Sequence, residues 1–157
     1  HAARAMIPQK SGSIINMAST AGIMGGLGPH AYAAAKHAVI GITKNTATEL
    51  AHHGIRVNAI APSGMATAMV AGLSGDPTDI DGTIARLAAA SPLKGRAGMA
   101  SDVANAALWL ASDESGYTTG HTLTTDAGTT IGATTNAPNF VEYTQLIREA
   151  GKRGIED

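Results

Sequence analysis

The chain has 157 residues, of which 44% are hydrophobic, and its 11 Lys and Arg nearly balance its 12 Asp and Glu. Without a large charge of one sign it is not expected to bind nucleic acid or a membrane surface, and no apolar run approaches the ~20 residues of a membrane span. The absence of cysteine excludes disulfides and thiolate metal sites, and it is typical of the reducing cytoplasm. The six histidines lack an H-x-x-x-H spacing, so the sequence predicts one globular cytoplasmic domain without a metal site.

The first elements follow from hydrophobic periodicity. The opening HAARAMIPQKSG has the character of a helix end, and GSIINMAS (12–19) is a short apolar run that predicts a strand buried on both faces. Residues 23–29 are rich in glycine and predict a loop. From about Pro29, apolar residues recur at three- and four-residue intervals as far as Gly54, which can cap a helix in the left-handed conformation.

Three polar residues in this region form the predicted catalytic group. Tyr32 and Lys36 are four residues apart and share one face of the predicted helix, and Ser19 leaves the carboxyl end of the strand before it. A phenol is almost un-ionised at neutral pH, and a lysine charge one turn away favours its ionised form, which suits proton transfer. The alternative is a tyrosine packed at the start of an ordinary helix beside a solvated lysine. Y-x-x-x-K alone favours that alternative, and Ser19 at the matching distance favours the catalytic group.

With these residues the chain resembles the short-chain dehydrogenase/reductase family, whose pattern is a serine, about a dozen residues, and Y-x-x-x-K. Further matches follow in order: GIRVNAIAPSGMAT (54–67) is similar to the family's sixth strand and cofactor loop, ASDVANAALWLASDES (100–115) to its penultimate helix, and TTGHTLTTDAGT (118–129) to its last strand and turn. The resemblance covers residues 1–130.

The resemblance implies an α/β fold, a Rossmann-like doubly wound parallel sheet in three α/β/α layers. The chain would carry roughly the C-terminal half of that single domain. Residues 66–95 would be a substrate-loop insertion that includes the helical segment TIARLAAA, and residues 131–157 a C-terminal extension. In this extension Phe140, Tyr143, Ile147 and Ala150 recur at helical spacing, which predicts a short amphipathic tail helix.

The activity that the resemblance implies is NAD(P)-dependent interconversion of a secondary alcohol and a ketone. Tyr32 would act as general acid/base, Lys36 would favour the phenolate and bind the nicotinamide ribose, and Ser19 would orient the substrate oxygen. Hydride would pass directly to or from the NAD or NADP nicotinamide.

The family's P-G-x-x-x-T cofactor loop corresponds to Pro62, Gly64 and Thr67 here. By position, the Thr67 hydroxyl and the backbone of Met65 would hold the nicotinamide carboxamide. Thr67 is also suited to cap the helix that begins with AMVAG, and both roles can coexist. The chain departs from the family at Ser63, where glycine is usual, and in the final turn, which reads Asp-Ala-Gly instead of Asp-Gly-Gly.

The expected substrate is a small alcohol or ketone, apolar or alicyclic. Met69 lies in the insertion that closes over the substrate in the family, and flexible Met side chains suit such a ligand. His30 would line the mouth of the pocket. The alternatives are an ordinary core position for Met69 and a loop-capping role for His30. In the penultimate helix, a broad apolar face of Ala106, Leu108, Trp109 and Leu110 is expected, and by analogy with the family the protein is expected to be a homotetramer or dimer.

The printed sequence contains no T-G-x-x-x-G-x-G loop and no residue that would read the adenosine ribose. The choice between NAD and NADP therefore stays open, and the chain is expected to be the C-terminal portion of a longer subunit. Two other functions remain alternatives: a non-catalytic oligomerisation or binding module of the same fold, and an epimerase or dehydratase. The P-S-G-M-A-T loop and the D-A-G turn favour the dehydrogenase over the epimerase or dehydratase.

Overall fold

The computed structural model describes residues 1–136. The predicted tail helix of Phe140, Tyr143, Ile147 and Ala150 lies outside these residues and stays a prediction. In chain order the helices and strands are α1 (Ala2–Met6), β1 (Gly12–Met17), α2 (His30–Leu50), β2 (Ile55–Pro62), α3 (Ala68–Gly72), α4 (Ile80–Ala90), α5 (Ala100–Ala111) and β3 (Thr122–Thr125). Short 3-10 turns are η1 (Thr20–Gly22), η2 (Ala51–His53), η3 (Asp113–Ser115) and η4 (Thr129–Ile131).

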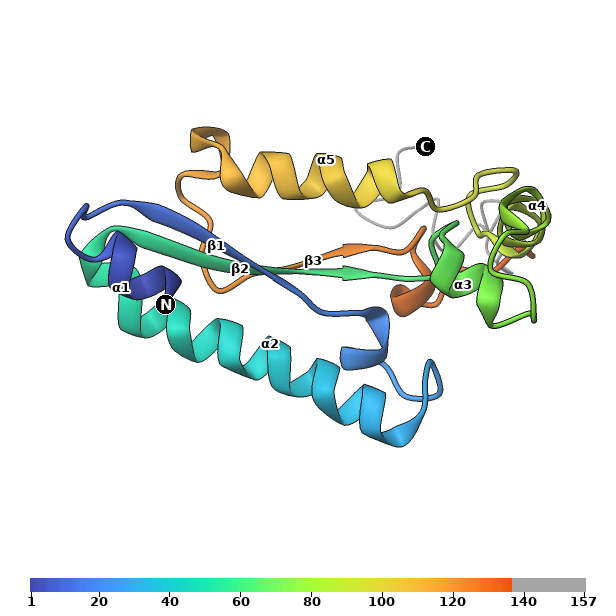
Figure 1. The fold of residues 1–157 in the computed structure, drawn as a ribbon, viewed down its shortest axis with the longest axis horizontal. Helices are drawn as coiled ribbons and strands as arrows, with labels where there is room; N and C mark the ends of the chain where they lie inside the picture. Colours follow the sequence, from blue (N-terminus) through green and yellow to red (C-terminus); the bar gives the residue numbers. More distant parts are fainter. Residues whose placement is uncertain (137–157) are drawn as a thin grey trace, which may run out of the picture.

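The three strands form one parallel sheet in the order β1-β2-β3. Helices α1 and α2 cover one face of this sheet and α5 covers the other (Figure 1). The predicted doubly wound, three-layer α/β/α arrangement is thus confirmed for the part of the chain that the structure describes. Since all strands run in the same direction, their carboxyl ends meet at one edge, where the turns after β1, β2 and β3 come together.

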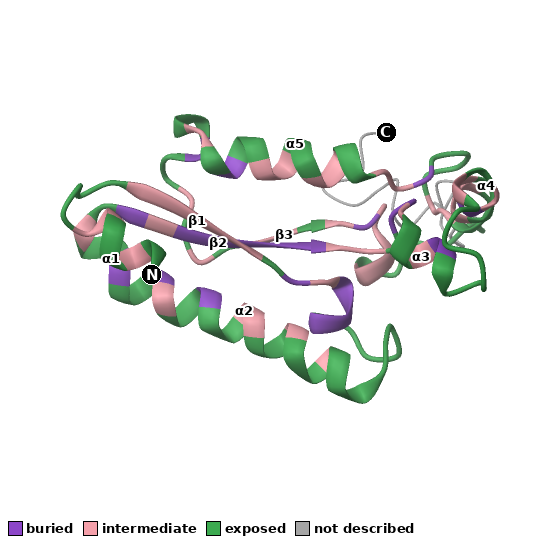
Figure 2. Cartoon of the chain, viewed as in Figure 1, coloured by how far each residue is buried: buried purple, intermediate pink, exposed green. Residues whose placement is uncertain are grey.

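The central strand β2 forms the core. Val57, Ala59, Ile60 and Ala61 have no exposed surface, and Figure 2 shows this strand as the most continuously buried element. Toward its carboxyl end the core residues facing α2 are small: Ala18, Ala59 and Ala61 pack against Val39 and Ile40 of the helix. Small side chains let a helix approach a sheet closely, which holds α2 near the ends of β1 and β2.

Strand β1 and helix α2 both end earlier than the sequence predicts. Strand β1 stops at Met17, two residues before the predicted end, because Ser19 already caps the turn η1. Helix α2 ends at Leu50, and η2 then leads to Gly54, whose φ of 72° confirms the predicted left-handed cap. No helix of residues 1–136 has the length and apolar character needed to cross a membrane.

The apolar residues predicted for one face of α5 differ widely in exposure. Leu110 is fully buried, but Leu108 is 69% exposed and Trp109 is 37% exposed. The reason is geometric: a straight helix lying on a sheet buries only one stripe of its surface, and Leu108 and Trp109 fall beside that stripe. The carboxyl end of α5 is fixed by Arg56, which donates hydrogen bonds to the Leu110 carbonyl at 3.0 Å and to other acceptors of the following turn.

Candidate active site

Ser19 lies where β1 gives way to η1. Its Oγ accepts a hydrogen bond from the amide of Ala21 at 3.2 Å and thereby caps the turn. The same oxygen lies 3.5 Å from the carbonyl oxygen of Pro62, the last residue of β2. Ser19 is half-buried. The structure therefore places its hydroxyl between the ends of two neighbouring strands, at the edge of the sheet where parallel α/β proteins bind ligands.

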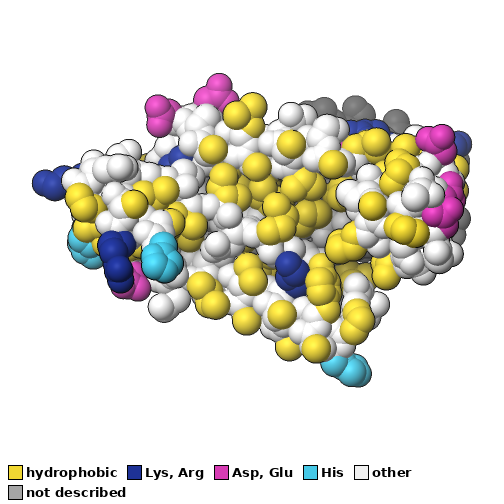
Figure 3. All heavy atoms as spheres, viewed as in Figure 1, with side chains coloured by type: hydrophobic (Ala, Val, Ile, Leu, Met, Phe, Trp, Pro, Cys, Tyr) yellow, Lys and Arg dark blue, Asp and Glu magenta, His cyan; other side chains and the backbone are white. Residues whose placement is uncertain are grey.

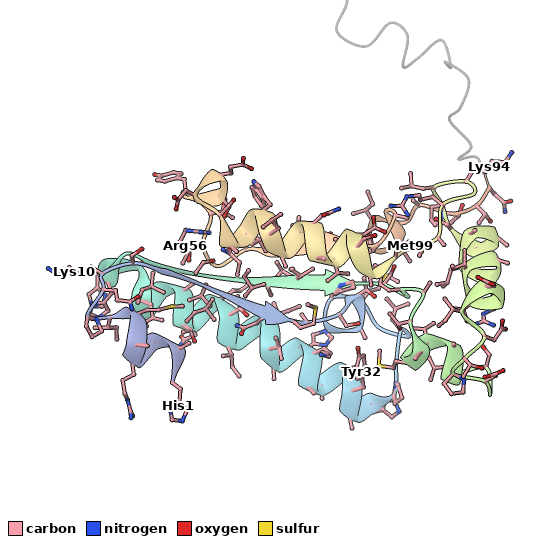
Figure 4. All side chains as sticks on the ribbon, turned by 45° about the horizontal axis from the view of Figure 1, so that its top comes forward. His1, Lys10, Tyr32, Arg56, Lys94 and Met99 are labelled. Carbon is pink, nitrogen blue, oxygen red and sulfur yellow. The ribbon has the colours of Figure 1, made fainter. Side chains whose placement is uncertain are left out.

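Tyr32 and Lys36 project from the first two turns of α2. The Lys36 Nζ lies 5.5 Å from the centroid of the Tyr32 ring, which confirms that the two side chains share a face of the helix. The ammonium also donates a hydrogen bond to the carbonyl of Met17 at 3.0 Å. Met17 is two residues before Ser19, so this bond brings Lys36 to the strand end from which Ser19 projects. Tyr32 is 39% exposed, and Figure 4 shows it near the start of α2.

Two glycines allow the loop before α2 to pack against this pair. A Cβ added to Gly28 would lie 2.9 Å from Cδ1 of Tyr32, and one added to Gly22 would lie 2.6 Å from the carbonyl oxygen of Lys36. Real Cβ atoms do not approach other atoms so closely, so both contacts depend on the missing side chain. Gly22 ends the turn that Ser19 caps, and the turn therefore rests directly on the backbone of α2 at Lys36. The structure thus brings the three predicted catalytic residues into one neighbourhood.

The predicted cofactor loop follows β2 at the same edge of the sheet. The amide of Ser63 donates to the Thr125 carbonyl at 3.1 Å, and the amide of Ala66 donates to the Gly98 carbonyl at 2.8 Å. Among the described residues, the amides of Gly64 and Met65 between them donate to no group. The loop is therefore fixed at both ends, while its middle offers two backbone donors, which fits the predicted role of holding a carboxamide.

Thr67 takes the helix-capping role that the sequence analysis gave as an alternative. Its Oγ1 accepts from the amide of Val70 at 3.5 Å and donates to the Met65 carbonyl at 3.3 Å, at the start of α3. The hydroxyl thus fixes the conformation of the loop, and its contact with a cofactor stays a prediction. His30 and Met69, the two predicted substrate residues, are both exposed, and their contact with a substrate stays a prediction.

A cavity that the sequence did not predict lies beside the cofactor loop. It has a volume of about 290 Å³ and lies among the loop, α4, the start of α5 and the turn after β3, away from the three catalytic candidates. Its walls combine the apolar side chains of Leu87, Pro92 and Leu93 with the polar Ser63 and Asp126. No local sequence pattern predicts such a cavity, because its walls come from several separate segments between residues 63 and 129.

Two carboxylates fix the backbone around this cavity. Burial by itself would raise the pKa of the Asp126 carboxyl, but hydrogen bonds from the Thr130 hydroxyl and amide and from the Gly128 amide together lower it below the ordinary value. The Met99 amide, at 2.8 Å, and the ion pair with Arg96 lower the pKa of Asp102. Figure 4 shows Met99 at the start of α5, next to the cofactor loop. Both carboxylates serve local structure and are fully paired.

The chain is similar to known proteins over most of its length. Residues 1–130 match the family described as enoyl-(acyl carrier protein) reductase. The chain is 48% identical over 134 residues to (+)-borneol dehydrogenase 2 of Salvia officinalis, an alignment that covers 83% of the chain and 47% of that protein. The chain thus spans about half the length of the curated relatives it matches.

Two solved structures share the fold. Levodione reductase superposes with a TM-score of 0.72 at 35% identity, over 82% of this chain and 50% of that one. A protein from Beutenbergia cavernae with NADP bound at low occupancy superposes with a TM-score of 0.65 at 39% identity, over 80% of this chain and 48% of that one. The family match, the sequence identity and the shared fold all point to the family whose serine, tyrosine and lysine pattern the chain carries at the edge of its sheet. The chain belongs to the short-chain dehydrogenase/reductase family.

Proposed function

We propose that the protein catalyses the NAD(P)-dependent interconversion of a secondary alcohol and a ketone. One observation carries the proposal: the Lys36 ammonium lies 5.5 Å from the Tyr32 ring while it is bonded to the Met17 carbonyl, beside Ser19. A phenol, an ammonium and an aliphatic hydroxyl thus lie near one another at the carboxyl edge of a parallel sheet. This arrangement suits proton transfer at the oxygen of an alcohol or ketone.

Each residue has a distinct part in the proposed reaction. In alcohol oxidation the Tyr32 oxygen accepts the hydroxyl proton of the substrate, and in ketone reduction it returns a proton to the carbonyl oxygen. Ser19 donates a hydrogen bond to the same substrate oxygen and holds it at the phenol. Lys36 provides the positive charge beside the phenol, and its bond to Met17 keeps that charge in place. The nicotinamide, when bound, accepts or supplies the hydride.

The cofactor part of the proposal rests on the loop after β2. The amides of Gly64 and Met65, which donate to no group of residues 1–136, would hold the carboxamide. Lys36 and Tyr32 would contact the nicotinamide ribose, and Pro62 and Thr67 would fix the loop at its ends. The relative from Beutenbergia cavernae has NADP bound. NAD and NADP both remain candidates for this protein. Titration of the full-length protein with NADH and NADPH, followed by coenzyme fluorescence, distinguishes them.

The proposed substrate is a small apolar or alicyclic alcohol or its ketone. The relatives support this class by their names, since one is a borneol dehydrogenase and another a levodione reductase. His30 and Met69 stay in the proposal as residues that contact the substrate. His30 is the first residue of α2 and Met69 lies on α3, and both side chains are exposed in the described part of the chain. A ligand between these two helices would cover them.

Replacement of the phenol tests the proposed function. Tyr32→Phe in the full-length protein removes only the hydroxyl and is expected to lower kcat by at least about 100-fold, the usual contribution of a general acid/base. Coenzyme binding, measured by fluorescence titration, is expected to change little. Turnover at the parental rate in the Tyr32→Phe variant would reject the assignment.

We also propose a cytoplasmic homo-oligomer, a tetramer or dimer. Large apolar side chains on the outer helices support self-association, since Ile42 of α2 is 60% exposed and Leu108 of α5 is 69% exposed. Figure 3 shows further hydrophobic side chains along the β1 edge, between α2 and α5. The lack of cysteine supports the proposed cytoplasmic location, because disulfides are rare in that reducing compartment. Light scattering coupled to size-exclusion chromatography measures the oligomeric state. A monomer at micromolar concentration would contradict the proposed homo-oligomer.

A further inference from the structure

The carbonyl of Pro62 has two hydroxyl groups beside it. Ser19 Oγ lies 3.5 Å from the carbonyl oxygen, and Thr20 Oγ1 lies 3.3 Å from it. Both distances exceed the ~2.7–2.8 Å of a strong bond between a hydroxyl and an oxygen. The Thr20 contact is the shorter of the two. Thr20 is only 5% exposed, so water has little access to replace its hydroxyl.

Ser19 is held in place by a different bond. Its oxygen accepts the amide hydrogen of Ala21, which fixes the position of Oγ through the turn and not through the hydroxyl proton. A serine hydroxyl has one proton to donate and two lone pairs to accept with. The proton of Ser19 is therefore free to point to the Pro62 carbonyl or to another acceptor. In the proposed reaction that other acceptor is the substrate oxygen.

We propose that Thr20 is a positioning residue that supplies the Pro62 carbonyl with a hydrogen bond, so that Ser19 keeps its proton for the substrate. This inference rests on the proposed function, because it assigns Ser19 to the substrate oxygen. If Ser19 alone served the carbonyl, its donation to the substrate would leave a half-buried carbonyl without a partner. With Thr20 present, Ser19 turns from one acceptor to the other and the carbonyl stays bonded.

The same bond links the catalytic turn to the cofactor loop. Pro62 is the last residue of β2, and its carbonyl belongs to the peptide that leads into Ser63. Thr20 opens the turn η1, which rests on α2 at Lys36 through Gly22. One buried hydroxyl thus connects the element that carries Ser19 with the loop that would hold the nicotinamide. In the sequence, this role is indicated only by the hydroxyl residue Thr20 directly after Ser19, and the serine, tyrosine and lysine pattern does not include it.

A double-mutant cycle tests whether Thr20 acts through Ser19. Thr20→Val replaces the hydroxyl by a methyl group of similar shape, and Thr20→Ser restores the hydroxyl. In the full-length protein, Thr20→Val is expected to lower kcat/KM for the alcohol or ketone about fivefold, the usual effect of one hydrogen bond. Thr20→Ser is expected to stay within about twofold of the parent. In a Ser19→Ala background, Thr20→Val is expected to cause no further loss, because no serine proton remains to be diverted.

A second measurement separates this role from a merely structural one. A displaced cofactor loop would weaken coenzyme binding. Because the amides of Ser63 and Ala66 also fix this loop, the coenzyme Kd from fluorescence titration is expected to stay within about twofold in Thr20→Val. A loss that is equal in the Ser19 and Ser19→Ala backgrounds, or no loss in either, overturns the inference. If Thr20→Val does not fold, Thr20→Ala and Thr20→Ser complete the same cycle.

The proposed function fails separately from this inference. If the parent protein turns over no alcohol or ketone with either coenzyme, or if Tyr32→Phe retains full turnover, the proposed function is wrong and the inference falls with it. If the parent is active and Tyr32→Phe is inactive, the outcome of the double-mutant cycle concerns Thr20 alone.

Discussion

The Nζ of Lys36 donates a hydrogen bond to the carbonyl oxygen of Met17 at 3.0 Å, and it thereby joins the second turn of α2 to the end of β1. The bond fixes an ammonium that would otherwise move on a flexible side chain. It leaves two of the three ammonium protons for other partners. The position of the charge beside Tyr32 therefore depends on the packing of α2 against the sheet as well as on the helix itself.

Lys36→Met removes both the charge and this bond. We expect kcat of the full-length protein to fall about 100-fold or more, and the free energy of unfolding to fall by about 1 kcal/mol for the lost hydrogen bond. Steady-state kinetics and urea denaturation measure the two effects. Lys36→Arg retains the charge but changes its shape and reach, and it is expected to recover stability more than turnover. Full activity of Lys36→Met would contradict the role of the ammonium.

Gly28→Ala should misplace the catalytic ring without disturbing the core. The added Cβ would lie 2.9 Å from Cδ1 of Tyr32, so the ring has to move. Because an error of about 1 Å at a reacting group can cost about 100-fold in rate, we expect kcat to fall at least tenfold. Gly25→Ala is the matched control, since nothing lies within 4 Å of its added Cβ. Equal activity of the two variants would show that the Gly28 contact does not position Tyr32.

The departure from Asp-Gly-Gly has a conformational consequence at Ala127. Its φ of 54° lies in the left-handed region, where a Cβ costs roughly 1 kcal/mol. Ala127→Gly relieves this strain and is expected to raise the free energy of unfolding by about 0.5–1 kcal/mol, measured by urea denaturation. The control is Ala104→Gly at an exposed position inside α5, which is expected to lower it by about 1 kcal/mol. A destabilising Ala127→Gly would refute the strain.

Asp126 is expected to make stability depend on acid pH. Hydrogen bonds from Thr130 and Gly128 outweigh burial and keep the folded-state pKa of its carboxyl below the ordinary value. Its contribution is therefore complete above the unfolded pKa of about 3.9 and is lost as pH falls through the lower folded value. Asp126→Asn lacks the second carboxylate oxygen, and we expect it to lose about 1–3 kcal/mol at pH 7.

The difference between the parent and Asp126→Asn is expected to shrink below about pH 4, where the carboxyl of the unfolded parent becomes protonated, and to vanish as pH falls through the lower folded pKa. Urea denaturation at pH 7 and at pH 3 measures it. A difference that is the same at both pH values would mean that the charge of Asp126 does not contribute.

Most of the element types could be predicted from the sequence, while the partners of the site residues could not. The period of the apolar residues predicted α2, and Gly54 takes the predicted left-handed conformation after the short turn η2 that follows it. The apolar face of α5 was predicted without its degree of burial, because periodicity identifies the apolar residues but not how wide a stripe the sheet covers, and Leu108 and Trp109 lie exposed beside the buried Leu110. The cavity beside the cofactor loop could not be predicted, since its walls come from segments distant in sequence.

The sequence by itself determined that Tyr32 and Lys36 share a face, because residues four apart on a helix are neighbours whatever surrounds them. Only the tertiary structure decided that Lys36 bonds to Met17, 19 residues earlier, and that Ser19 and Thr20 reach Pro62, more than 40 residues later. Those contacts depend on the register of β1 with β2 and on how closely α2 approaches the sheet. Both are set by the packing of side chains that are far apart along the chain.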